Sequence, residues 1–194
     1  YSSISHMGFV LIGIYSGTEL ALQGVVVLMV AHAFSASGLF ILSGQLYERL
    51  HTRDMRLMGG LWGRIKGLPG FALCFVAASM GMPGTANFVG EFLVLFGSFE
   101  AWPWVVVIAS VGFVLAAIYS LFIMQRVYFG PAKEETPLGG LDRREGVMML
   151  GLLALVLWVG LYPAPLLSTS EAAMQNVERI MTLEQTPAMS EETP

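Results

Sequence analysis

Five long apolar stretches constrain the fold of this chain more than any other feature. A helix needs about 20 residues to cross the ~30 Å hydrocarbon core of a membrane, and four of the five stretches reach that length. They are rich in Leu, Val, Ala, Met and Phe and lack the period-two alternation of an outer-membrane strand, which favours transmembrane helices over a barrel. The predicted helices cover residues 2–16, 23–47, 68–97, 103–129 and 146–166.

The composition agrees with a membrane environment. Of the 194 residues, 55% are hydrophobic and 12% are charged, and the mean hydropathy is +0.68, which excludes an ordinary water-soluble domain. No basic stripe interleaved with aromatic residues is present, so nucleic acid is not an expected partner. The fold class is therefore all-α, a polytopic helical bundle in a lipid bilayer. Cys74 is the one cysteine, and we expect it to be a small buried hydrophobe.

The positions of Lys and Arg predict the orientation, because cytoplasmic loops carry the excess of basic residues. The loop at 48–66 holds five of the ten basic residues and the loop at 130–145 holds three. We therefore expect both loops to be cytoplasmic. Residues 1–167 would form the transmembrane unit, and residues 168–194 a polar tail on the non-cytoplasmic side. About the last 20 residues are expected to be solvated and partly disordered.

The start of the sequence is unusual for a complete membrane protein. Tyr1 leads directly into an apolar run without a basic flank, which is typical neither of a signal peptide nor of a natural start. We expect the sequence to be a piece of a longer chain, with part of the functional machinery upstream.

Glu91 is an ionisable side chain inside the third apolar stretch. A carboxylate at that depth costs several kcal/mol unless it pairs, hydrates or stays protonated. Pro83 and Gly84 lie near the middle of the same stretch, where proline interrupts helical hydrogen bonding. A broken helix is tolerated at membrane depth only against protein or a water-filled cavity. Together these features predict a hydrated interior site on one discontinuous helix broken near Pro83. A packing-only glutamate and a simple kink are the alternatives.

His6 and His32 lie in the first and second apolar stretches. Imidazole titrates near neutrality, so histidines on adjacent helices can pass protons where water or hydroxyl groups bridge them. Satisfied core histidines are the alternative. No metal site is predicted, because neither histidine has a local His or Cys partner at ligand spacing. Nearby serines that can supply hydroxyl groups are Ser2, Ser3, Ser5, Ser35 and Ser37.

The sequence shows no sign of redox chemistry. It has no cysteine array, no glycine-rich dinucleotide fingerprint and no nucleophile with a base at a recognisable spacing. No cofactor is expected in this chain, and electron transfer would belong to another one.

Four motifs occur together in this order: Ser-Ile-Ser-His-Met-Gly-Phe at 3–9, Ala-His-Ala-Phe-Ser-Ala-Ser-Gly-Leu-Phe at 31–40, His-Thr-Arg-Asp-Met-Arg at 51–56 and Pro-Gly-Thr-Ala-Asn-Phe-Val-Gly-Glu-Phe at 83–92. With them, residues 1 to about 166 resemble subunit M, the chain 4-type antiporter-like subunit of bacterial NADH–quinone oxidoreductase, respiratory complex I. In the related subunits L and N and in Mrp-type antiporters, lysine usually stands at the position of Glu91. Subunit L typically has a further lysine where this chain has Ala36. Both positions favour subunit M.

The resemblance implies a multi-pass protein of the bacterial inner membrane that moves protons beside other membrane subunits of complex I. Glu91 would be the terminal proton carrier, and His32 and His6 relay groups. NADH, FMN, iron–sulfur clusters and quinone would be bound by other subunits, and the family's buried lysines would precede Tyr1. One alternative is a subunit of an Mrp-type cation/proton antiporter that works without electron transfer. Another is a structural scaffold in which Glu91 only bonds to a neighbouring helix.

Overall fold

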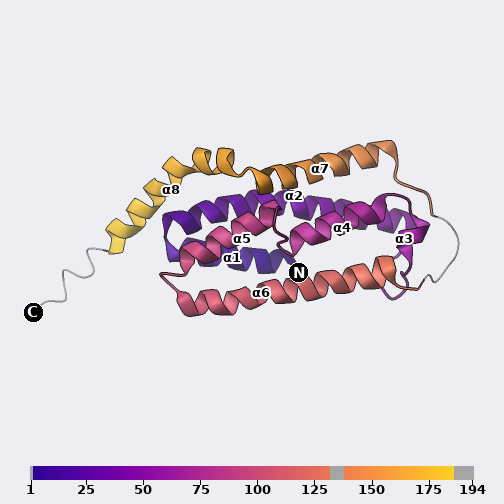
Figure 1. Ribbon diagram of the computed structural model, residues 1–194, viewed down its shortest axis with the longest axis horizontal. Coiled ribbons are helices and arrows are strands. Elements are labelled where there is room, and N and C mark those ends of the chain that lie inside the picture. Colours follow the sequence, from indigo (N-terminus) through magenta and orange to yellow (C-terminus); the bar gives the residue numbers. More distant parts are fainter. Residues whose placement is uncertain (1, 132–137, 186–194) are drawn as a thin grey trace, which may run out of the picture.

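Helices make up all the regular structure in the part of the chain that the computed structural model describes, residues 2–131 and 138–185 (Figure 1). This confirms the predicted all-α class. In chain order the elements are α1 Ser2–Ser16, α2 Glu19–Leu50, α3 Leu61–Arg64, α4 Leu68–Ser79, α5 Ala86–Ser98, α6 Pro103–Ile123, the π-helix η1 Met124–Phe129, α7 Arg143–Leu161 and α8 Ala164–Gln185.

Three helical segments among the described residues are long and apolar enough to cross a membrane. They are α2, the continuous rod formed by α6 and η1, and α7. The shorter apolar helices α4 and α5 follow one another along the same direction, and Figure 1 shows all of these elements running side by side along the long axis of the molecule. This parallel arrangement of apolar rods is what a polytopic bundle requires, because helices satisfy their backbone groups internally.

The predicted helix at 68–97 is discontinuous, as the sequence indicated. α4 ends at Ser79 and α5 begins at Ala86, and Pro83 lies between them. Gly81 and Gly84 adopt positive φ angles of 74° and 95°, a region that residues with a Cβ rarely enter. The chain therefore leaves the helix, turns and re-enters it within the membrane-spanning layer of the bundle.

Close packing between α2 and α5 forms the centre of the bundle. A Cβ added at Gly90 would lie 2.6 Å from the Leu28 backbone, and one added at Gly97 would lie 2.5 Å from the Ala21 nitrogen. Gly24 approaches α5 from the opposite side in the same way. Small residues let helix backbones approach closely inside a membrane. These three glycines, Gly24, Gly90 and Gly97, are called the glycine seam below.

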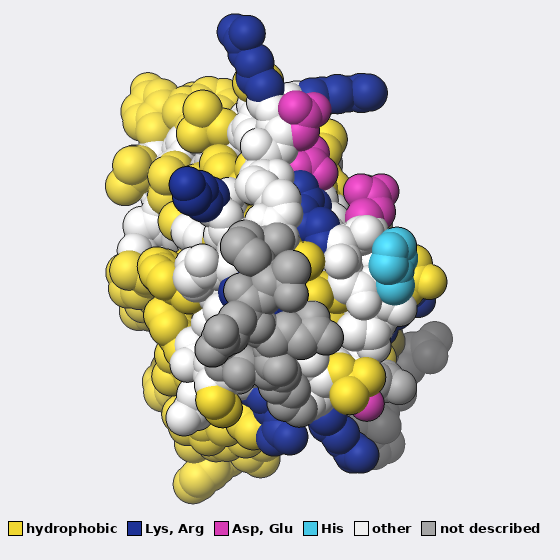
Figure 2. All heavy atoms as spheres, turned by 90° about the vertical axis from the view of Figure 1, so that its right-hand side faces the viewer, with side chains coloured by type: hydrophobic (Ala, Val, Ile, Leu, Met, Phe, Trp, Pro, Cys, Tyr) yellow, Lys and Arg dark blue, Asp and Glu magenta, His cyan; other side chains and the backbone are white. Residues whose placement is uncertain are grey.

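Arg49, in the last turn of α2, connects the end of α2 to the start of α7. This end of the bundle carries the two basic loops and is called the basic end below. The Arg49 guanidinium forms an ion pair of 2.7 Å with Glu145 at the start of α7 and donates to the carbonyl oxygens of Gly139 and Gly140. Glu145 also accepts from the backbone nitrogen of Asp142 at 2.8 Å. Figure 2 views this end and shows several Lys and Arg side chains around it. Lys133, which the sequence placed in the second basic loop, lies outside the described residues.

The end of the chain differs from the prediction. The predicted helix at 146–166 ends at Leu161, and a separate helix α8 continues from Ala164 to Gln185. The predicted polar tail thus begins as a helix, and most of its side chains from Ser168 to Met181 are exposed or half-buried. α8 is ordered by contact with the first residue of α2, because Glu19 bonds to Gln175 and to Glu178. Residues 186–194 of the predicted tail lie outside the described residues.

The expectation that Cys74 is buried was also wrong. Its side chain is exposed on the outer face of α4. The next residue, Phe75, is fully buried against Gly38 of α2. One face of α4 therefore packs on the bundle, and Cys74 belongs to the other face, where an apolar side chain suits lipid as well as protein.

The glycine seam predicts that Gly97→Ala destabilises the protein. In the intact protein the new Cβ would overlap the Ala21 backbone, and overpacking costs about 1–3 kcal/mol. The unfolding midpoint and the yield of assembled protein should both fall. Gly151→Ala is the control, because Gly151 lies in a helix with nothing within 4 Å of its Cβ position and alanine is the better helix former. Equal stability of the two variants would contradict close packing at the seam.

Candidate functional site

The structure brings the three predicted site residues together from three helices. His6 comes from α1, His32 from α2 and Glu91 from α5. His6 Nε2 lies 3.2 Å from Glu91 Oε1, and the two imidazole rings stack with their centroids 4.9 Å apart. His6 and Glu91 are each 3% exposed. His32 is half-buried. The His6–His32–Glu91 group is called the buried triad below, after its two buried members.

The backbone of α1 orients the His6 ring. Its Nδ1 lies 2.8 Å from the carbonyl oxygen of Ser2, one turn earlier in the same helix. A carbonyl oxygen only accepts, so Nδ1 carries the proton of this hydrogen bond. Nε2 is thereby left to face Glu91. The contact is close in distance but is not aligned as a hydrogen bond, and both His6 Nε2 and Glu91 Oε2 lack a hydrogen-bond partner among the described residues.

A buried polar bridge joins α2 to α5 next to the triad. Asn87 Nδ2 donates to Ser35 Oγ at 3.0 Å, and both side chains are at most 1% exposed. Ser35 follows His32 by three residues, and Asn87 precedes Glu91 by four, so each lies one turn from a triad residue on its own helix. The bridge therefore fixes how α2 and α5 are rotated about their axes at the level of the triad.

The break between α4 and α5 forms one wall of the site. A Cβ added at Gly81 would lie 2.6 Å from Glu91 Oε2 and 3.0 Å from the Phe113 ring of α6. The absence of a side chain at Gly81 thus leaves room for the carboxyl group. Gly160 of α7 covers the other side of the break, where its Cα approaches the Gly84 carbonyl. Gly81 is buried next to the carboxyl group, whereas Met82 and Pro83 of the break are exposed.

The serines named from the sequence differ in their environments and in their hydrogen-bond partners. Ser35 is committed to Asn87, Ser37 is exposed, and Ser2 contributes its backbone carbonyl to the site. Within residues 2–131 and 138–185, no three His, Cys, Asp or Glu side chains are arranged to hold a metal ion.

Two contributors to the site were not singled out from the sequence, Asn87 and Gly81. Asn87 could have been found by its spacing, because a residue four positions before Glu91 lies on the same helix face. Gly81 gave no such signal. Its proximity to the carboxyl group depends on the path of the chain through the break.

Comparison with known proteins identifies relatives of this chain. A family model described as "NADH:quinone oxidoreductase/Mrp antiporter, TM" matches residues 1–117. A protein of Pseudomonas aeruginosa named NADH-quinone oxidoreductase subunit M is 59% identical over 92% of this chain and 35% of its own length. A protein of Escherichia coli K12 with the same name is 54% identical over 92% of this chain and 36% of its own length.

A solved structure shares the fold. It is described as respiratory complex I from Thermus thermophilus with bound NADH, and the matched chain superimposes with a TM-score of 0.84 at 31% identity. The match covers 91% of this chain and 38% of that chain. The chain thus spans about a third of the length of the curated relatives it matches.

The wall formed by Gly81 predicts that Gly81→Ala displaces the Glu91 carboxyl group. Gly84→Ala is the matched control, because both glycines have positive φ but Gly84 has no atom closer than 3.9 Å to its Cβ position. Both variants should lose about 1–2 kcal/mol of stability through backbone strain. Only Gly81→Ala should shift the infrared band of Glu91, assigned by its loss in Glu91→Gln. An unchanged band would contradict the close approach.

Proposed function

Because the chain belongs to the NADH:quinone oxidoreductase/Mrp antiporter transmembrane family, we propose that it is part of a proton-translocating membrane subunit of an NADH–quinone oxidoreductase. NADH oxidation and quinone reduction would take place in other subunits, which would also bind the flavin, the iron–sulfur clusters and the quinone. Residues 1–167 would be the last five transmembrane helices of the subunit. Its partners would be neighbouring membrane subunits of the complex and the lipid bilayer.

The buried triad is the observation that carries this proposal. Glu91 is the one Asp, Glu, Lys or Arg in residues 67–99, and it is buried against a histidine rather than against a permanently charged Lys or Arg. An ion pair built only for packing gains most from a partner with a fixed charge. A histidine partner, which can be neutral or charged, suits a group that must take up and release a proton.

The geometry of His6 and Glu91 sets how many protons the pair holds. His6 Nδ1 is committed to the Ser2 carbonyl, which leaves Nε2, 3.2 Å from Glu91 Oε1, as the ring nitrogen that could exchange one proton with the carboxyl group. The pair is neutral overall whether the proton lies on the carboxyl group or on the imidazole. Without that proton two acceptors would face each other in a buried site, which is unfavourable. Loading and unloading of one proton would thus switch the pair between a stable and an unstable state.

His32 extends the pathway from the pair towards α2. Its ring stacks on His6, and its buried Nδ1 has no hydrogen-bond partner among the described residues. A water molecule or a group of another segment at Nδ1 would continue the path. The Ser35–Asn87 bridge holds α2 and α5 in place while the proton moves.

The family description also includes Mrp antiporters. The two bacterial relatives, at 59% and 54% identity, both carry the oxidoreductase name, which favours the oxidoreductase over the antiporter.

The chain is a multi-pass protein of the bacterial inner membrane.

Substitution of Glu91 tests the proposal. In the assembled complex, Glu91→Gln keeps the shape of the side chain and removes its titration, so proton translocation coupled to NADH–quinone turnover should fall by about tenfold or more. Glu91→Asp keeps a titrating group and should retain more of both activities. The measurements are NADH–quinone turnover and proton uptake in vesicles, compared at equal assembly.

The opposite order would indicate a scaffold. Glutamine preserves neutral hydrogen bonding, whereas aspartate is shorter by one methylene and would leave a gap. Near-normal pumping in Glu91→Gln together with poor assembly of Glu91→Asp would therefore refute a proton carrier at this position.

The orientation proposed from the basic loops has its own test. Thr52→Cys, in a Cys74→Ser background that removes the exposed native thiol, should react with a membrane-impermeant thiol reagent from the cytoplasmic face only. The reason is that the loop at 48–66 carries five of the ten basic residues. Labelling is compared in inside-out vesicles and intact cells, and reaction in intact cells would reverse the orientation.

A further inference from the structure

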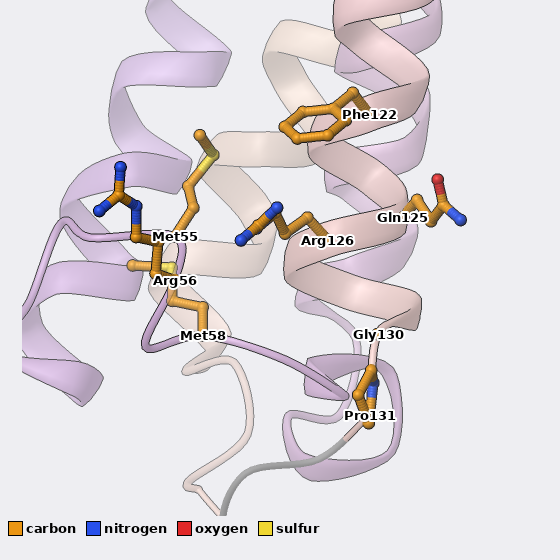
Figure 3. A pocket seen from close by; sticks show the side chains of 8 residues that line it. All are labelled: Met55, Arg56, Met58, Phe122, Gln125, Arg126, Gly130 and Pro131. Atoms are coloured by element: carbon orange, nitrogen blue, oxygen red, sulfur yellow. The ribbon is translucent and has the colours of Figure 1, made fainter.

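The buried triad lies between the two ends of the bundle, and these ends differ in charge. Figure 3 shows the basic end, where Arg126 extends from the α6–η1 rod towards the loop that carries Met55 and Met58. The opposite end is formed by the turn between α1 and α2 and the turn between α5 and α6, where Glu19 and Glu100 lie. It is called the far end below. Under the orientation proposed from the basic loops, the far end faces the non-cytoplasmic side.

Between the triad and the far end, each of the three triad helices carries a buried apolar side chain. These are Val10 of α1, Leu28 of α2 and Val94 of α5, and each is three or four positions from the triad residue of its own helix. Such spacing corresponds to one helical turn, about 5 Å along the axis. The three side chains belong to one cluster of buried residues, in which Leu28 and Val94 are fully buried. They are called the apolar layer below.

The apolar layer is closely packed against its surroundings. A Cβ added at Gly13 of α1 would lie 2.5 Å from Val25 Cγ2 and 3.3 Å from Val94 Cγ2, so the backbone of α1 directly contacts side chains of α2 and α5. On the side of α6 the rings of Phe9 and Phe113 pack with their centroids 5.6 Å apart. A narrow apolar constriction of this kind is dry at rest, and a proton crosses it only when water enters.

A buried hydroxyl group lies beyond the apolar layer. Ser98 follows Val94 by four residues on α5 and is 0% exposed. Its Oγ has no hydrogen-bond partner among the described residues. Ser16 and Ser79, by contrast, each donate to a carbonyl oxygen three residues earlier. A buried hydroxyl group without a protein partner is suited to an ordered water molecule.

Ser98 is also close to the surface of the far end. The two residues that follow it, Phe99 and Glu100, are exposed. The residue that precedes it, Gly97, accepts a hydrogen bond of 2.9 Å from the hydroxyl group of Thr18 in the turn between α1 and α2. A water molecule at Ser98 would therefore lie between the apolar layer and the solvent.

We propose that a water molecule bound at Ser98 receives the proton of Glu91, and that the apolar layer is the gate between them. This inference rests on the proposed function, because it assigns the route by which the proton of the His6–Glu91 pair leaves. Glu91 and Ser98 are seven residues apart on α5, about 10 Å along the helix, so a short chain of water molecules connects them when the layer is wet.

The proton transfer changes the charge of the pair by one. The bond that holds the shared proton breaks, a water molecule in the layer accepts the proton, and the chain of water molecules passes it to the water at Ser98. The pair is left with one negative charge until it is loaded again. While the layer is dry, the proton stays on the pair.

Hydrogen–deuterium exchange of the Glu91 carboxyl group tests the gate without turnover. The assembled complex, without NADH, is transferred to D2O at a pH low enough for the carboxyl group to be protonated. The measurement is the rate at which the infrared band of Glu91, assigned by its loss in Glu91→Gln, shifts. Val94→Thr keeps the shape of valine and adds a hydroxyl group that holds water in the layer. Exchange should become about tenfold faster, the effect of one additional hydrogen bond.

Val27→Thr is the matched control. Val27 is fully buried on α2 next to Leu28, but it packs with Ala86 and Val159 in a cluster separate from the apolar layer. Exchange in this variant should stay within about twofold of the unchanged protein, which is less than one hydrogen bond contributes. Ser98→Ala removes the hydroxyl group that holds the water, so exchange should be about fivefold slower.

A second variant of the layer guards against failure of assembly. Val10→Thr adds a hydroxyl group to the same layer from α1 and should accelerate exchange as Val94→Thr does. Equal acceleration in Val27→Thr would show general loosening of the bundle and would overturn the gate. Unchanged exchange in the layer variants, or in Ser98→Ala, would overturn this route as well.

Failure of this route and failure of the proposed function are distinguishable. Near-normal pumping in Glu91→Gln would refute the proton carrier, but it would leave the order of the exchange rates intact because they are measured without turnover. Unchanged exchange in the layer variants together with a pumping defect in Glu91→Gln would keep Glu91 as the carrier and exclude its release through the apolar layer.

Discussion

Direct contact between the backbones of α2 and α5 sets the geometry on which the rest of the molecule depends. At Gly24, Gly90 and Gly97 no room exists for a side chain, and inside lipid such contacts replace the hydrophobic driving force that would order helices in water. Thr18 ties the same two helices at their ends, since its hydroxyl donates to the Gly97 carbonyl and accepts from the Ala21 nitrogen. Because Gly90 directly precedes Glu91, the seam also determines where the carboxyl group points.

The break between α4 and α5 gives the buried carboxyl group its surroundings. An uninterrupted helix would place side chains and a closed hydrogen-bond ladder where Gly81 now leaves space next to Glu91. The unpaired backbone groups of such a break need protein or water around them, and α7 supplies part of that cover through Gly160. Enclosure and polarity thus occur at the same level of the bundle, which is where an ionisable group can be held without exposure to lipid.

Much of this site could be predicted from the sequence, because Glu91, His6 and His32 are polar groups in apolar runs and Pro83 marks the break. The sequence fixes spacing within one helix but not the rotation of one helix against the next, so the 3.2 Å approach of His6 to Glu91 and the Ser35–Asn87 bridge were out of reach. The burial of Cys74 was predicted wrongly for another reason. The exposed and the packed face of α4 are both apolar, and hydropathy does not distinguish them. Helix α8 was missed because its polar sequence is ordered by contacts with α2 that are distant in the chain.

The distribution of charge separates the buried triad from the basic end of the bundle. Among the described residues, each Lys and Arg lies in a loop, at a helix end or after α7, and residues 67–99 contain Glu91 as their one Asp, Glu, Lys or Arg. A buried carboxyl group without a fixed countercharge is held only by what its neighbours offer, and here the closest is an imidazole. Under the proposed function, the proton of the pair would be held between the carboxyl group and that imidazole, 3.2 Å apart, and the Lys and Arg side chains at the basic end would take no part in holding it.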